Sequence, residues 1–346
     1  MSRKPSIQSM ADQLGLSKYA VSRALSGKSG VSPATRERVL ELAKTLGYGL
    51  PAPKAAGPSP VSASSFVLIC INQTNRGDAS YWQRVLAGLI SGCSERGWHH
   101  AIVSQPVSFP AATTLSPQEL IAPHLDWGSC LGIIVMGAYP YPVLQLMVRT
   151  GKPLVLLDHH EPLLSCDEVN HANIDAGFLI GHHLLAGRKC RRLVFLGDDG
   201  RSTSFAERRI GVRLARDRYG SPETELQEWE LPYEAGGWLE AAAERFGRLA
   251  PGERPDAWIG ANDDIAMQWM QRLRQIGCSV PEEAQVAGID NVEGAALSSP
   301  RLTTIHLGKE ELGRRTVETL ERRIAHPGTP IERIQMGAVL IPRDSA

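Results

Sequence analysis

The sequence has no net charge, few aromatic residues and no closely spaced pairs of cysteines. It contains 37 Lys and Arg residues against 37 Asp and Glu residues, and Phe, Trp and Tyr make up only 6% of its 346 residues. The six cysteines are scattered without a C-x-x-C pair, so neither a structural zinc site nor a disulfide framework is expected. With 42% hydrophobic residues, the chain favours an aliphatic α/β core and is long enough for more than one domain.

Long apolar runs are also absent. No stretch approaches the roughly 18 residues that span a bilayer. The N-terminus carries Arg3 and Lys4 but lacks the apolar segment of a signal peptide. We therefore expect a cytoplasmic protein that has no membrane partner.

The familiar catalytic motifs are missing too. The chain has no G-x-S-x-G elbow, phosphate-binding loop, H-E-x-x-H zinc motif or kinase signature. Several histidines occur as adjacent pairs, at 99–100, 159–160 and 182–183, and adjacent side chains point in different directions. We therefore expect no enzyme activity, no catalytic residue, no cofactor and no metal site.

The most informative stretch is residues 6–26, whose spacing predicts two short helices around a tight turn. Gly15 ends the first helix, and Ser17 is placed to cap the second. Such a pair of helices presents its second member to the major groove of DNA. The expected buried positions of the two helices are Ile7, Met10, Ala11, Leu14, Ala20, Val21, Ala24 and Leu25.

A third helix is predicted from Ser32 and Pro33 to Gly47, which completes a small three-helix core. Residues 1–54 carry nine Lys or Arg and three Asp or Glu, so this N-terminal segment has a net charge of +6 and the rest of the chain −6. A basic head on an acidic body suits phosphate contact at one end. The alternative is a helical bundle whose positive charge only keeps it soluble.

The composition changes between Tyr48 and Phe66, where prolines stand at 51, 53, 58 and 60. Closely spaced prolines prevent a continuous helix and favour an extended linker. We place a head at 1–49, a linker at 50–65 and a body at 66–346.

Short apolar runs alternate with helical patterns throughout the body, which indicates parallel strands covered by helices on both faces. The series runs once to residue 158 and restarts near residue 175, so two doubly wound lobes are expected. We assign 66–160 plus 293–322 to the first lobe and 161–292 plus 323–346 to the second. A cleft between such lobes holds small polar ligands at the carboxyl ends of the strands.

Several motifs resemble the LacI/GalR family of bacterial transcription regulators. In the head they are A-x-x-L-G-L-S, V-S-R-A-L-S, V-S-P-A-T-R-E-R-V and L-G-Y. In the body the resemblance is strongest in the second half, where PDAWIGANDDIAMQ, QVAGIDN and SSPRLTTIHLGKEELG follow the family pattern. The resemblance implies a lambda-repressor-like helix-turn-helix head and a two-lobed body like the periplasmic binding proteins.

The resemblance also implies roles for the head residues. Lys18, Tyr19 and Arg23 match positions that reach base edges, while Ser17 and Ser22 match positions that touch phosphates, and we add Ser6 to the DNA-binding set. Family members usually have a short hinge helix after the head, whose leucine enters the minor groove. The proline-rich linker departs from that pattern, so we expect minor-groove wedging to be absent or altered.

In the body, the family arginine of an R-x-x-G pattern matches Arg208, which we expect to fork two ligand oxygens. The adjacent Arg209 is the alternative ligand contact. Without a ligand role, Arg208 would form a surface ion pair with Glu207 or another carboxylate. Asp290 ends an apolar strand, where its carboxylate would accept from ligand hydroxyls at the rim of the cleft.

Further effector-binding candidates follow other strands. Asn262 and Asp263 end A-W-I-G-A-N-D, although Asp263 could equally cap the helix that begins there. Trp82 could stack on a sugar ring or pack in the core, and its neighbour Tyr81 is assigned to the core. The two remaining candidates are Asn75 and Asp158.

The sequence therefore predicts a sequence-specific transcriptional regulator, expected to be a repressor, that is controlled by a small polar metabolite. Its partners would be double-stranded operator DNA, an effector such as a sugar or sugar acid, and a second copy of the chain, because one small head makes too few contacts for specificity. Assembly beyond the dimer stays open, and such a DNA-binding protein is expected to be associated with the nucleoid. The alternative is a soluble sugar-binding receptor without a role in DNA regulation.

Overall fold

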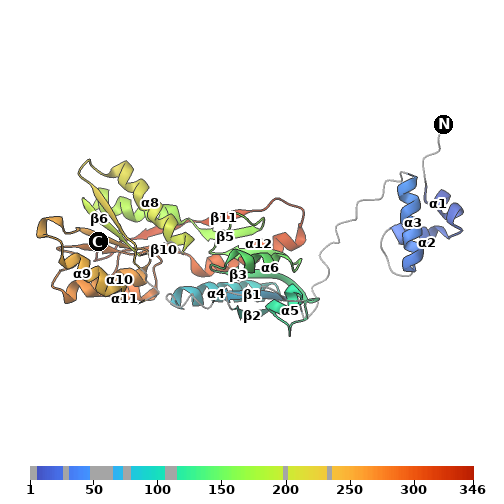
Figure 1. The fold of residues 1–346 in the computed structure, drawn as a ribbon, viewed down its shortest axis with the longest axis horizontal. Helices are drawn as coiled ribbons and strands as arrows, with labels where there is room; N and C mark the ends of the chain where they lie inside the picture. Colours follow the sequence, from blue (N-terminus) through green and yellow to red (C-terminus); the bar gives the residue numbers. More distant parts are fainter. Residues whose placement is uncertain are drawn as a thin grey trace. The chain divides into compact units, whose positions relative to one another are not determined.

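The computed structural model describes residues 6–25, 31–46, 65–72, 79–105, 115–197, 202–231 and 236–346. The chain divides into two compact units between Pro60 and Val61 (Figure 1). The predicted linker at 50–65, with its expected effect on minor-groove wedging, lies outside the described residues except for Ser65.

The N-terminal unit contains α1 (Ile7–Leu14), α2 (Lys18–Leu25) and α3 (Pro33–Thr45). Gly15 adopts a left-handed conformation with φ of 66°, and its N–H donates to the carbonyl of Ala11, which ends α1. The predicted helix-turn-helix is therefore confirmed. The buried residues of its small core are Met10, Ala11, Val21, Ala24, Val39 and Ala43.

The first lobe of the body is built on a six-stranded parallel sheet with the strand order β2-β1-β3-β4-β5-β11. Successive residues of β1 are buried on opposite faces: Val67 and Ile69 pack against α4 and α12, and Leu68 and Cys70 pack with residues of α5 and α6. The elements of this lobe are β1 (Phe66–Asn72), α4 (Ala79–Glu95), β2 (His99–Gln105), α5 (Pro117–Ile121), β3 (Cys130–Met136), α6 (Tyr141–Val148), β4 (Leu154–Leu157), β5 (Asp167–His171), α12 (Lys309–Ala325) and β11 (Arg333–Met336).

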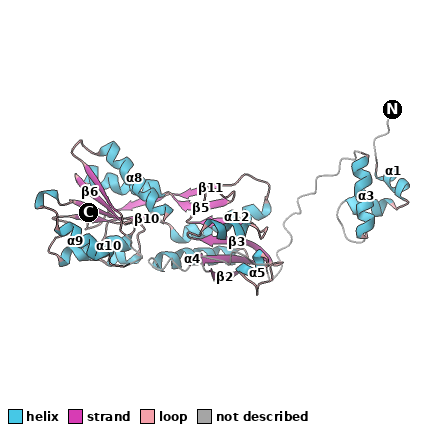
Figure 2. Cartoon of the chain, viewed as in Figure 1, coloured by secondary structure: helices cyan, strands magenta, loops and turns pink. Residues whose placement is uncertain are grey.

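The second lobe has a four-stranded parallel sheet, ordered β7-β6-β8-β9, and an antiparallel pair formed by β10 and β12. Its core contains three fully buried tryptophans, Trp229, Trp258 and Trp269. Figure 2 shows helices covering the strands. The elements are α7 (Asn173–His182), a π-helical turn (His183–Gly187), β6 (Arg192–Leu196), α8 (Thr203–Tyr219), β7 (Glu225–Trp229), α9 (Trp238–Gly247), a 3₁₀ turn (Pro251–Glu253), β8 (Ala257–Gly260), α10 (Asp263–Gln275), β9 (Gln285–Ala287), α11 (Glu293–Leu297), β10 (Thr304–Leu307) and β12 (Ala338–Ile341).

The chain passes between the lobes three times: from β5 to α7, from β10 to α12, and from β11 to β12. The first and third crossings touch, since the N–H of Ala172 donates to the carbonyl of Met336 at 2.8 Å. The predicted doubly wound, two-lobed body is therefore confirmed.

The predicted boundaries of the lobes differ from the structure. Strands β5 and β11 were assigned to the second lobe but pair in the first sheet, and α11 and β10 were assigned to the first lobe but belong to the second. The cause lies in β5, whose sequence Asp-Glu-Val-Asn-His lacks the apolar run that marks the other central strands. Because β5 was not recognised as a strand, the sequence analysis placed the first crossing between the lobes near residue 160, whereas it lies at Ala172 in the structure.

Helices α7 and α8 approach each other through glycines. A Cβ at Gly177 would lie 1.9 Å from the carbonyl oxygen of Arg208, and one at Gly211 would lie 2.0 Å from that of Ile174. No backbone oxygen tolerates such a contact, so the two helices pack this closely only with glycine at both positions. The contact also sets where Arg208 stands relative to α7.

Gly211→Ala is therefore expected to destabilise the body by about 1–3 kcal/mol, because overpacking forces α8 away from α7. Denaturant unfolding of the two proteins measures the difference. Gly247→Ala is the matched control, since a Cβ there meets no atom of the described residues within 4 Å and should leave stability unchanged or slightly raised. Equal stability of Gly211→Ala and the wild type would contradict the close packing.

All six cysteines are buried and unpaired. Among the described residues, no helix combines the length and apolar character needed to cross a membrane. The same residues contain no group of three or more His, Cys, Asp and Glu side chains arranged to hold a metal ion.

Candidate functional site

The solvent face of α2 carries the residues expected to read DNA. Lys18, Tyr19 and Ser22 are exposed, and Tyr19 is 68% exposed, which is unusual for a large aromatic side chain. Arg23 donates a hydrogen bond to the Tyr19 hydroxyl, and its guanidinium lies 5.2 Å from the centre of the Tyr19 ring. This face therefore presents an aromatic and a cationic side chain in direct contact.

Two of the expected DNA-binding serines act as helix caps. The Ser6 hydroxyl accepts from the N–H of Ser9 at the start of α1, and the Ser17 hydroxyl accepts from the N–H of Ala20 at the start of α2. A cap orients the first turn of its helix, so Ser17 fixes the end of α2 that carries Lys18 and Tyr19. Contact of these serines with phosphate stays a prediction.

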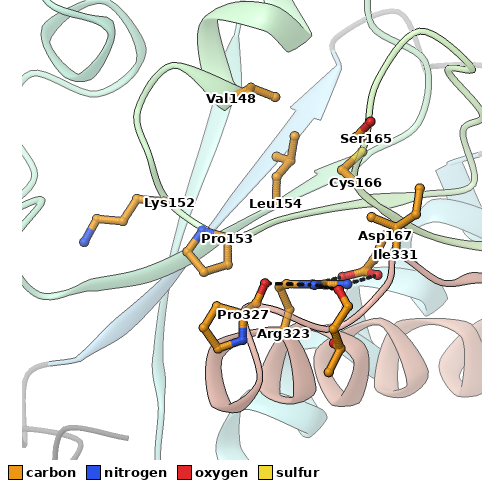
Figure 3. A pocket seen from close by; sticks show the side chains of 11 residues that line it. Val148, Lys152, Pro153, Leu154, Ser165, Cys166, Asp167, Arg323, Pro327 and Ile331 are labelled. Carbon is orange, nitrogen blue, oxygen red and sulfur yellow. Dashed lines mark hydrogen bonds and ion pairs between the residues drawn. The ribbon is translucent and has the colours of Figure 1, made fainter. Parts of the chain in front are cut away.

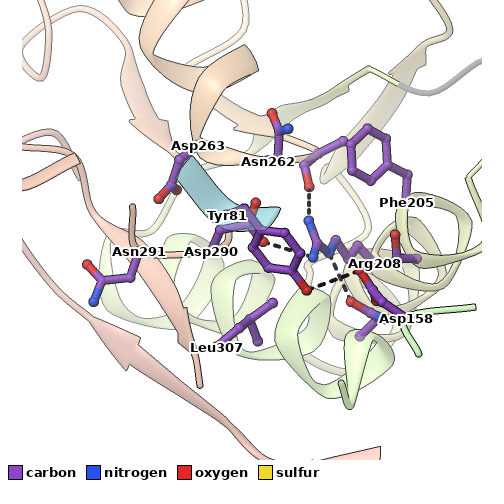
Figure 4. Close-up of polar contacts among 12 residues, drawn as sticks. Tyr81, Asp158, Phe205, Arg208, Asn262, Asp263, Asp290, Asn291 and Leu307 are labelled. Carbon is purple, nitrogen blue, oxygen red and sulfur yellow. Dashed lines mark hydrogen bonds and ion pairs between the residues drawn. The ribbon is translucent and has the colours of Figure 1, made fainter. Parts of the chain in front are cut away.

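In the body, Arg208 on α8 is 2% exposed and binds groups from three segments. Its guanidinium donates to the Asn173 side chain at 3.0 Å, to the carbonyl of Ala261 at 2.8 Å and to the Asp290 carboxylate at 2.9 Å (Figure 4). Arg208 thus pairs with another carboxylate, as the alternative allowed, but the pair is buried and does not involve Glu207. The alternative, Arg209, is the residue with surface partners, and it pairs with Glu228 and Glu230.

Asp290 has two cations beside it. It is 2% exposed and has φ of 129°, a conformation that non-glycine residues rarely adopt. Burial raises the pKa of this carboxyl, whereas Arg208 and Lys309 lower it. Lys309, at the start of α12, is fully buried and donates to the backbone carbonyls of Asp290 and Leu307. Arg208, Asp290 and Lys309 thus form one charged cluster beside the second crossing.

Asn262 and Asp263 lie together at the start of α10. The N-cap role considered for Asp263 belongs to Asn262, whose side chain accepts from the N–H of Ile265 at 2.9 Å. Asp263 instead accepts from the N–H of Val292 at 2.9 Å and from the Thr304 hydroxyl, so it ties α10 to the segment between β9 and β10. Burial and the nearby Asp290 raise the pKa of Asp263 to about 7.

Asp158 and Tyr81 face the same cluster from the first lobe. The Tyr81 hydroxyl donates to the Asp158 carboxylate at 3.0 Å, and Figure 4 shows this pair beside Arg208. Burial raises the pKa of Asp158 to about 6, although Arg208 and the Tyr81 hydrogen bond oppose the shift. Tyr81 is buried as expected. Trp82 packs against it in an edge-to-face arrangement, with 5.1 Å between the two ring centres.

The raised pKa of Asp158 predicts a pH dependence of stability. Between its ordinary value of 3.8 and about 6, the folded chain keeps a proton that the unfolded chain has released. This contribution to stability is therefore complete below about pH 4 and is lost as the pH rises through about 6.

Asp158→Asn should remove this dependence, because the amide oxygen still accepts from Tyr81 but does not titrate. The difference in melting temperature between wild type and variant is measured from pH 4 to pH 8, and we expect the wild type to lose stability relative to the variant over that range. A constant difference would contradict the assigned pKa.

The structure thus brings together Arg208, Asp290, Asp158, Asn262 and Asp263, while Asn75 lies outside the described residues. Sequence reasoning missed Lys309, which belongs to the charged cluster. It also missed Asn173, which binds Arg208, and His171, which packs against Tyr81. Lys309 begins a helix and His171 ends a polar strand, so neither carries an apolar or spacing signal that distinguishes it. Asn173 stands at the position where the first crossing enters α7.

A separate open cavity of about 340 Å³ lies at the other side of the first lobe (Figure 3). Its main charged groups bind each other: Arg323 donates to both oxygens of Asp167 and to the carbonyls of Pro327, Thr329 and Pro330. The cavity therefore contains a structural ion pair that closes the loop after α12.

Two family models match the chain. Residues 6–49 match the bacterial regulatory proteins of the lacI family, and residues 182–346 match the periplasmic binding protein-like domain. The chain is 26% identical over 352 residues to the HTH-type transcriptional repressor PurR of Haemophilus influenzae, which covers 98% of both chains. The PurR repressor of Vibrio cholerae is also 26% identical and covers 98% of this chain and 97% of its own length.

Solved structures agree in fold over the whole length. The transcriptional regulator CelR in complex with cellobiose has a TM-score of 0.67 and 23% identity, covering 99% of this chain and all of its own. The lac repressor dimer bound to operator and an anti-inducer has a TM-score of 0.66 and 21% identity, covering 99% of both chains. The helix-turn-helix, the two-lobed body and these matches together show that the chain belongs to the LacI family of bacterial regulatory proteins.

Proposed function

We propose that the chain is a sequence-specific transcriptional repressor that binds operator DNA as a homodimer and is controlled by a small polar metabolite. The observation that carries this proposal is the solvent face of α2, where the paired Tyr19 and Arg23 stand beside Lys18 on a helix with a capped N-terminus. An aromatic ring, an ammonium and a guanidinium are suited to base edges in the major groove.

The proposals of a homodimer and of a DNA partner rest on the two-fold symmetry of an operator and on the relatives of the chain. One three-helix head makes few base contacts, and two heads on a two-fold operator double them. The lac repressor structure is a dimer bound to operator, and the relatives from Haemophilus influenzae and Vibrio cholerae are named transcriptional repressors. A tetramer is not needed for this mode of recognition.

The proposed effector site is the charged cluster where the lobes meet. Asp158, Arg208 and Asp290 come from both lobes, and polar side chains that converge from two lobes are suited to binding a small polar ligand. We include Asn262, Asp263, Trp82 and Asn75 as further effector contacts. CelR was solved with cellobiose and a related regulator from Enterococcus faecium with ribose, which supports a sugar or sugar derivative.

The proposed control of DNA binding by the effector follows from the three segments that pass between the lobes. Three short segments join the lobes, so a ligand that contacts both lobes shifts their relative orientation. Helix α12 carries Lys309 at the second crossing and packs along α4 of the first lobe. In a dimer that uses the first lobe as an interface, this shift changes the spacing of the two heads.

The test is a binding-site selection from random duplex DNA with the purified full-length chain. We expect enrichment of a palindromic sequence, with one half-site for each head, at moderate salt. Recovery of no common sequence would overturn the repressor proposal and favour the sugar-binding receptor without a DNA role. A size measurement of the selected complex gives the number of chains per operator.

A further inference from the structure

Two helices of the second lobe present apolar side chains to solvent that the proposed function does not use. On α7, Ile174 is 37% exposed, and on α8, Ile210 and Leu214 are 41% and 48% exposed. Tyr219, the last residue of α8, is 40% exposed. Large apolar side chains at such exposure are ordinary when they stand singly, whereas a contiguous group of them marks an interaction surface.

These side chains form one surface because α7 and α8 lie against each other. A Cβ at Gly211 would lie 2.0 Å from the carbonyl oxygen of Ile174 and 2.7 Å from the backbone nitrogen of Phe178. Residues four positions apart lie on one side of a helix, so Ile174 and Phe178 share a side of α7, and Ile210 and Leu214 share a side of α8. The two apolar pairs therefore stand next to each other.

Tyr219 extends this surface to the end of α8. Its ring packs edge-on against those of Phe178 and His182 on α7, with 5.9 Å and 4.5 Å between the ring centres. Rings that already hold each other lose little freedom when a partner covers them. We call this surface the α7–α8 face, and its members are Ile174, Phe178, His182, Ile210, Leu214 and Tyr219.

The α7–α8 face lies on the opposite side of the second-lobe sheet from α10. The chain crosses the sheet in one direction from β6 to β7 and in the other direction from β8 to β9. Since connections between parallel strands are right-handed, α8 and α10 cover opposite faces. Figure 1 shows α8 above the strands and α9, α10 and α11 below them. A homodimer that uses the first lobe leaves the α7–α8 face uncovered.

The two ends of the face carry charges of opposite sign. Asp175 lies in the first turn of α7 and Glu207 in the second turn of α8. At the other end, the exposed Arg188 and Lys189 follow the π-helical turn that continues α7, and Arg218 lies in the last turn of α8. Each set complements the dipole of its own helix and leaves the face acidic at one end and basic at the other.

We propose that the α7–α8 face binds the same face of a second copy of the chain, with the helices of the two copies antiparallel. A two-fold axis across the helices then sets Asp175 opposite Arg188 and brings Glu207 near Arg218 of the other copy. A parallel arrangement would bring the acidic ends together, and like charges oppose association. A surface with one pole of each sign is complementary to itself and not to a partner of a single charge.

The packing of the helices sets where this axis lies. Gly181 stands midway in the chain between the acidic and the basic end of α7. A Cβ there would lie 2.8 Å from the Cβ of Ala215 and 3.4 Å from the Cα of Val212. On α8 the axis therefore passes between Val212 and Ala215, so the exposed Leu214 stands beside it and meets Leu214 of the other copy.

The size of the face indicates a weak association. Helix α8 has 17 residues. At about 1.5 Å per residue it is about 25 Å long, and two helices side by side are about 20 Å wide. The contact would cover about 500 Å² on each copy, or about 1,000 Å² in total, which is the lower limit for a specific interface. We therefore expect association at micromolar concentrations, with pairs of homodimers forming tetramers.

The first test is cross-linking of Leu214→Cys in the full-length chain. All six native cysteines are buried, so a short bismaleimide reacts with the introduced thiol. Leu163→Cys is the matched control, because Leu163 is 71% exposed but belongs to the first lobe. We expect covalent pairs of chains from Leu214→Cys at micromolar concentration and few from Leu163→Cys. Equal yields from the two variants, or no pairs from Leu214→Cys, would overturn the proposal.

The second test is sedimentation equilibrium of wild type and variants. Leu214→Glu should raise the concentration at half-association about tenfold or more, because it places two carboxylates beside the axis. Its melting temperature should stay unchanged, since the side chain is exposed. Asp175→Arg should also weaken association, and adding Arg188→Asp should restore it, because the exchanged charges pair again across the axis.

Two results of this measurement would contradict the antiparallel contact. One is a Leu214→Glu variant that associates as tightly as the wild type, which would leave the face to a different partner. The other is a double variant of Asp175 and Arg188 that associates no more tightly than Asp175→Arg alone.

The repressor proposal is judged separately on the same samples. Leu214→Glu should still form a homodimer and bind the selected operator, because both use other surfaces. If the wild type selects no operator sequence while Leu214→Cys still cross-links, the repressor proposal fails and the α7–α8 contact stands.

Discussion

Arg208→Ala is expected to lower the free energy of unfolding of the body by about 3–5 kcal/mol, the loss typical when one partner of a buried ion pair is removed. The truncation leaves Asp290 buried without its guanidinium partner, and it also removes donors from Asn173 and the carbonyl of Ala261. Since these three groups belong to α7, the end of β8 and the end of β9, the variant loosens several segments at once.

Denaturant unfolding of the full-length chain measures this loss. Arg209→Ala is the matched control, because Arg209 pairs with Glu228 and Glu230 near the surface and its loss should cost no more than about 1 kcal/mol. The double variant Arg208→Met with Asp290→Leu should recover much of the lost stability, since it removes both charges. A single Arg208→Ala variant as stable as Arg209→Ala would show that the buried pair is not formed.

This expectation changes how effector experiments on Arg208 are read. A variant that has lost both stability and effector response does not identify a ligand contact. The double variant separates the two effects, because it restores the folded body without restoring the guanidinium. Loss of the response in a stable double variant would assign Arg208 or Asp290 to the effector.

The sequence predicted those parts of the fold that local patterns determine. The head was recognisable because Gly15 and Ser17 end and begin helices within one short segment. A helix was expected to begin at Asp263, and α10 does begin there, although Asn262 rather than Asp263 caps it. The central strands were predicted because apolar residues stand on both of their faces.

The parts that depend on distant pairing were not predicted. Strand β5 is polar, and it becomes a strand because β4 and β11 bind it on both sides. The partner of Arg208, Asp290, lies 82 residues away, and its position at the end of a strand had assigned it to the ligand. The lobe boundaries failed for the same reason, since a crossing is recognised only when the strands on both sides are known.

The same dependence on distant pairing explains which residues of the candidate site could be predicted from the sequence. Arg208, Asp158 and Asp290 were found because each follows a strand or matches a motif, and strand ends meet at one edge of a sheet. His171 was missed because it ends a strand that the sequence does not reveal. Lys309 was missed because a lysine in the first turn of a helix is ordinarily a surface residue. The burial of both side chains is a property of the assembled crossings alone.

Arg23→Ala should abolish discrimination between operator and random DNA while the body stays folded. A base-contacting arginine contributes about 1–3 kcal/mol of discrimination at each half-site, so a dimer loses this amount twice. The loss extends to Tyr19, because the guanidinium of Arg23 holds the phenol ring through a hydrogen bond and a cation–π contact. Without that support, the exposed ring samples several rotamers and loses their entropy on binding.

The measurement is a binding-site selection followed by competition between the selected operator and random duplex at one fixed salt concentration. Ser22→Ala is the control, since an exposed serine that contacts phosphate should weaken binding to both DNAs alike and leave their ratio unchanged. Tyr19→Phe keeps the ring but removes the hydroxyl that accepts from Arg23, so it should lose part of the discrimination. If Arg23→Ala instead selects the wild-type operator with the same preference over random DNA, Arg23 does not read bases, and Lys18 and Tyr19 must carry the specificity of α2.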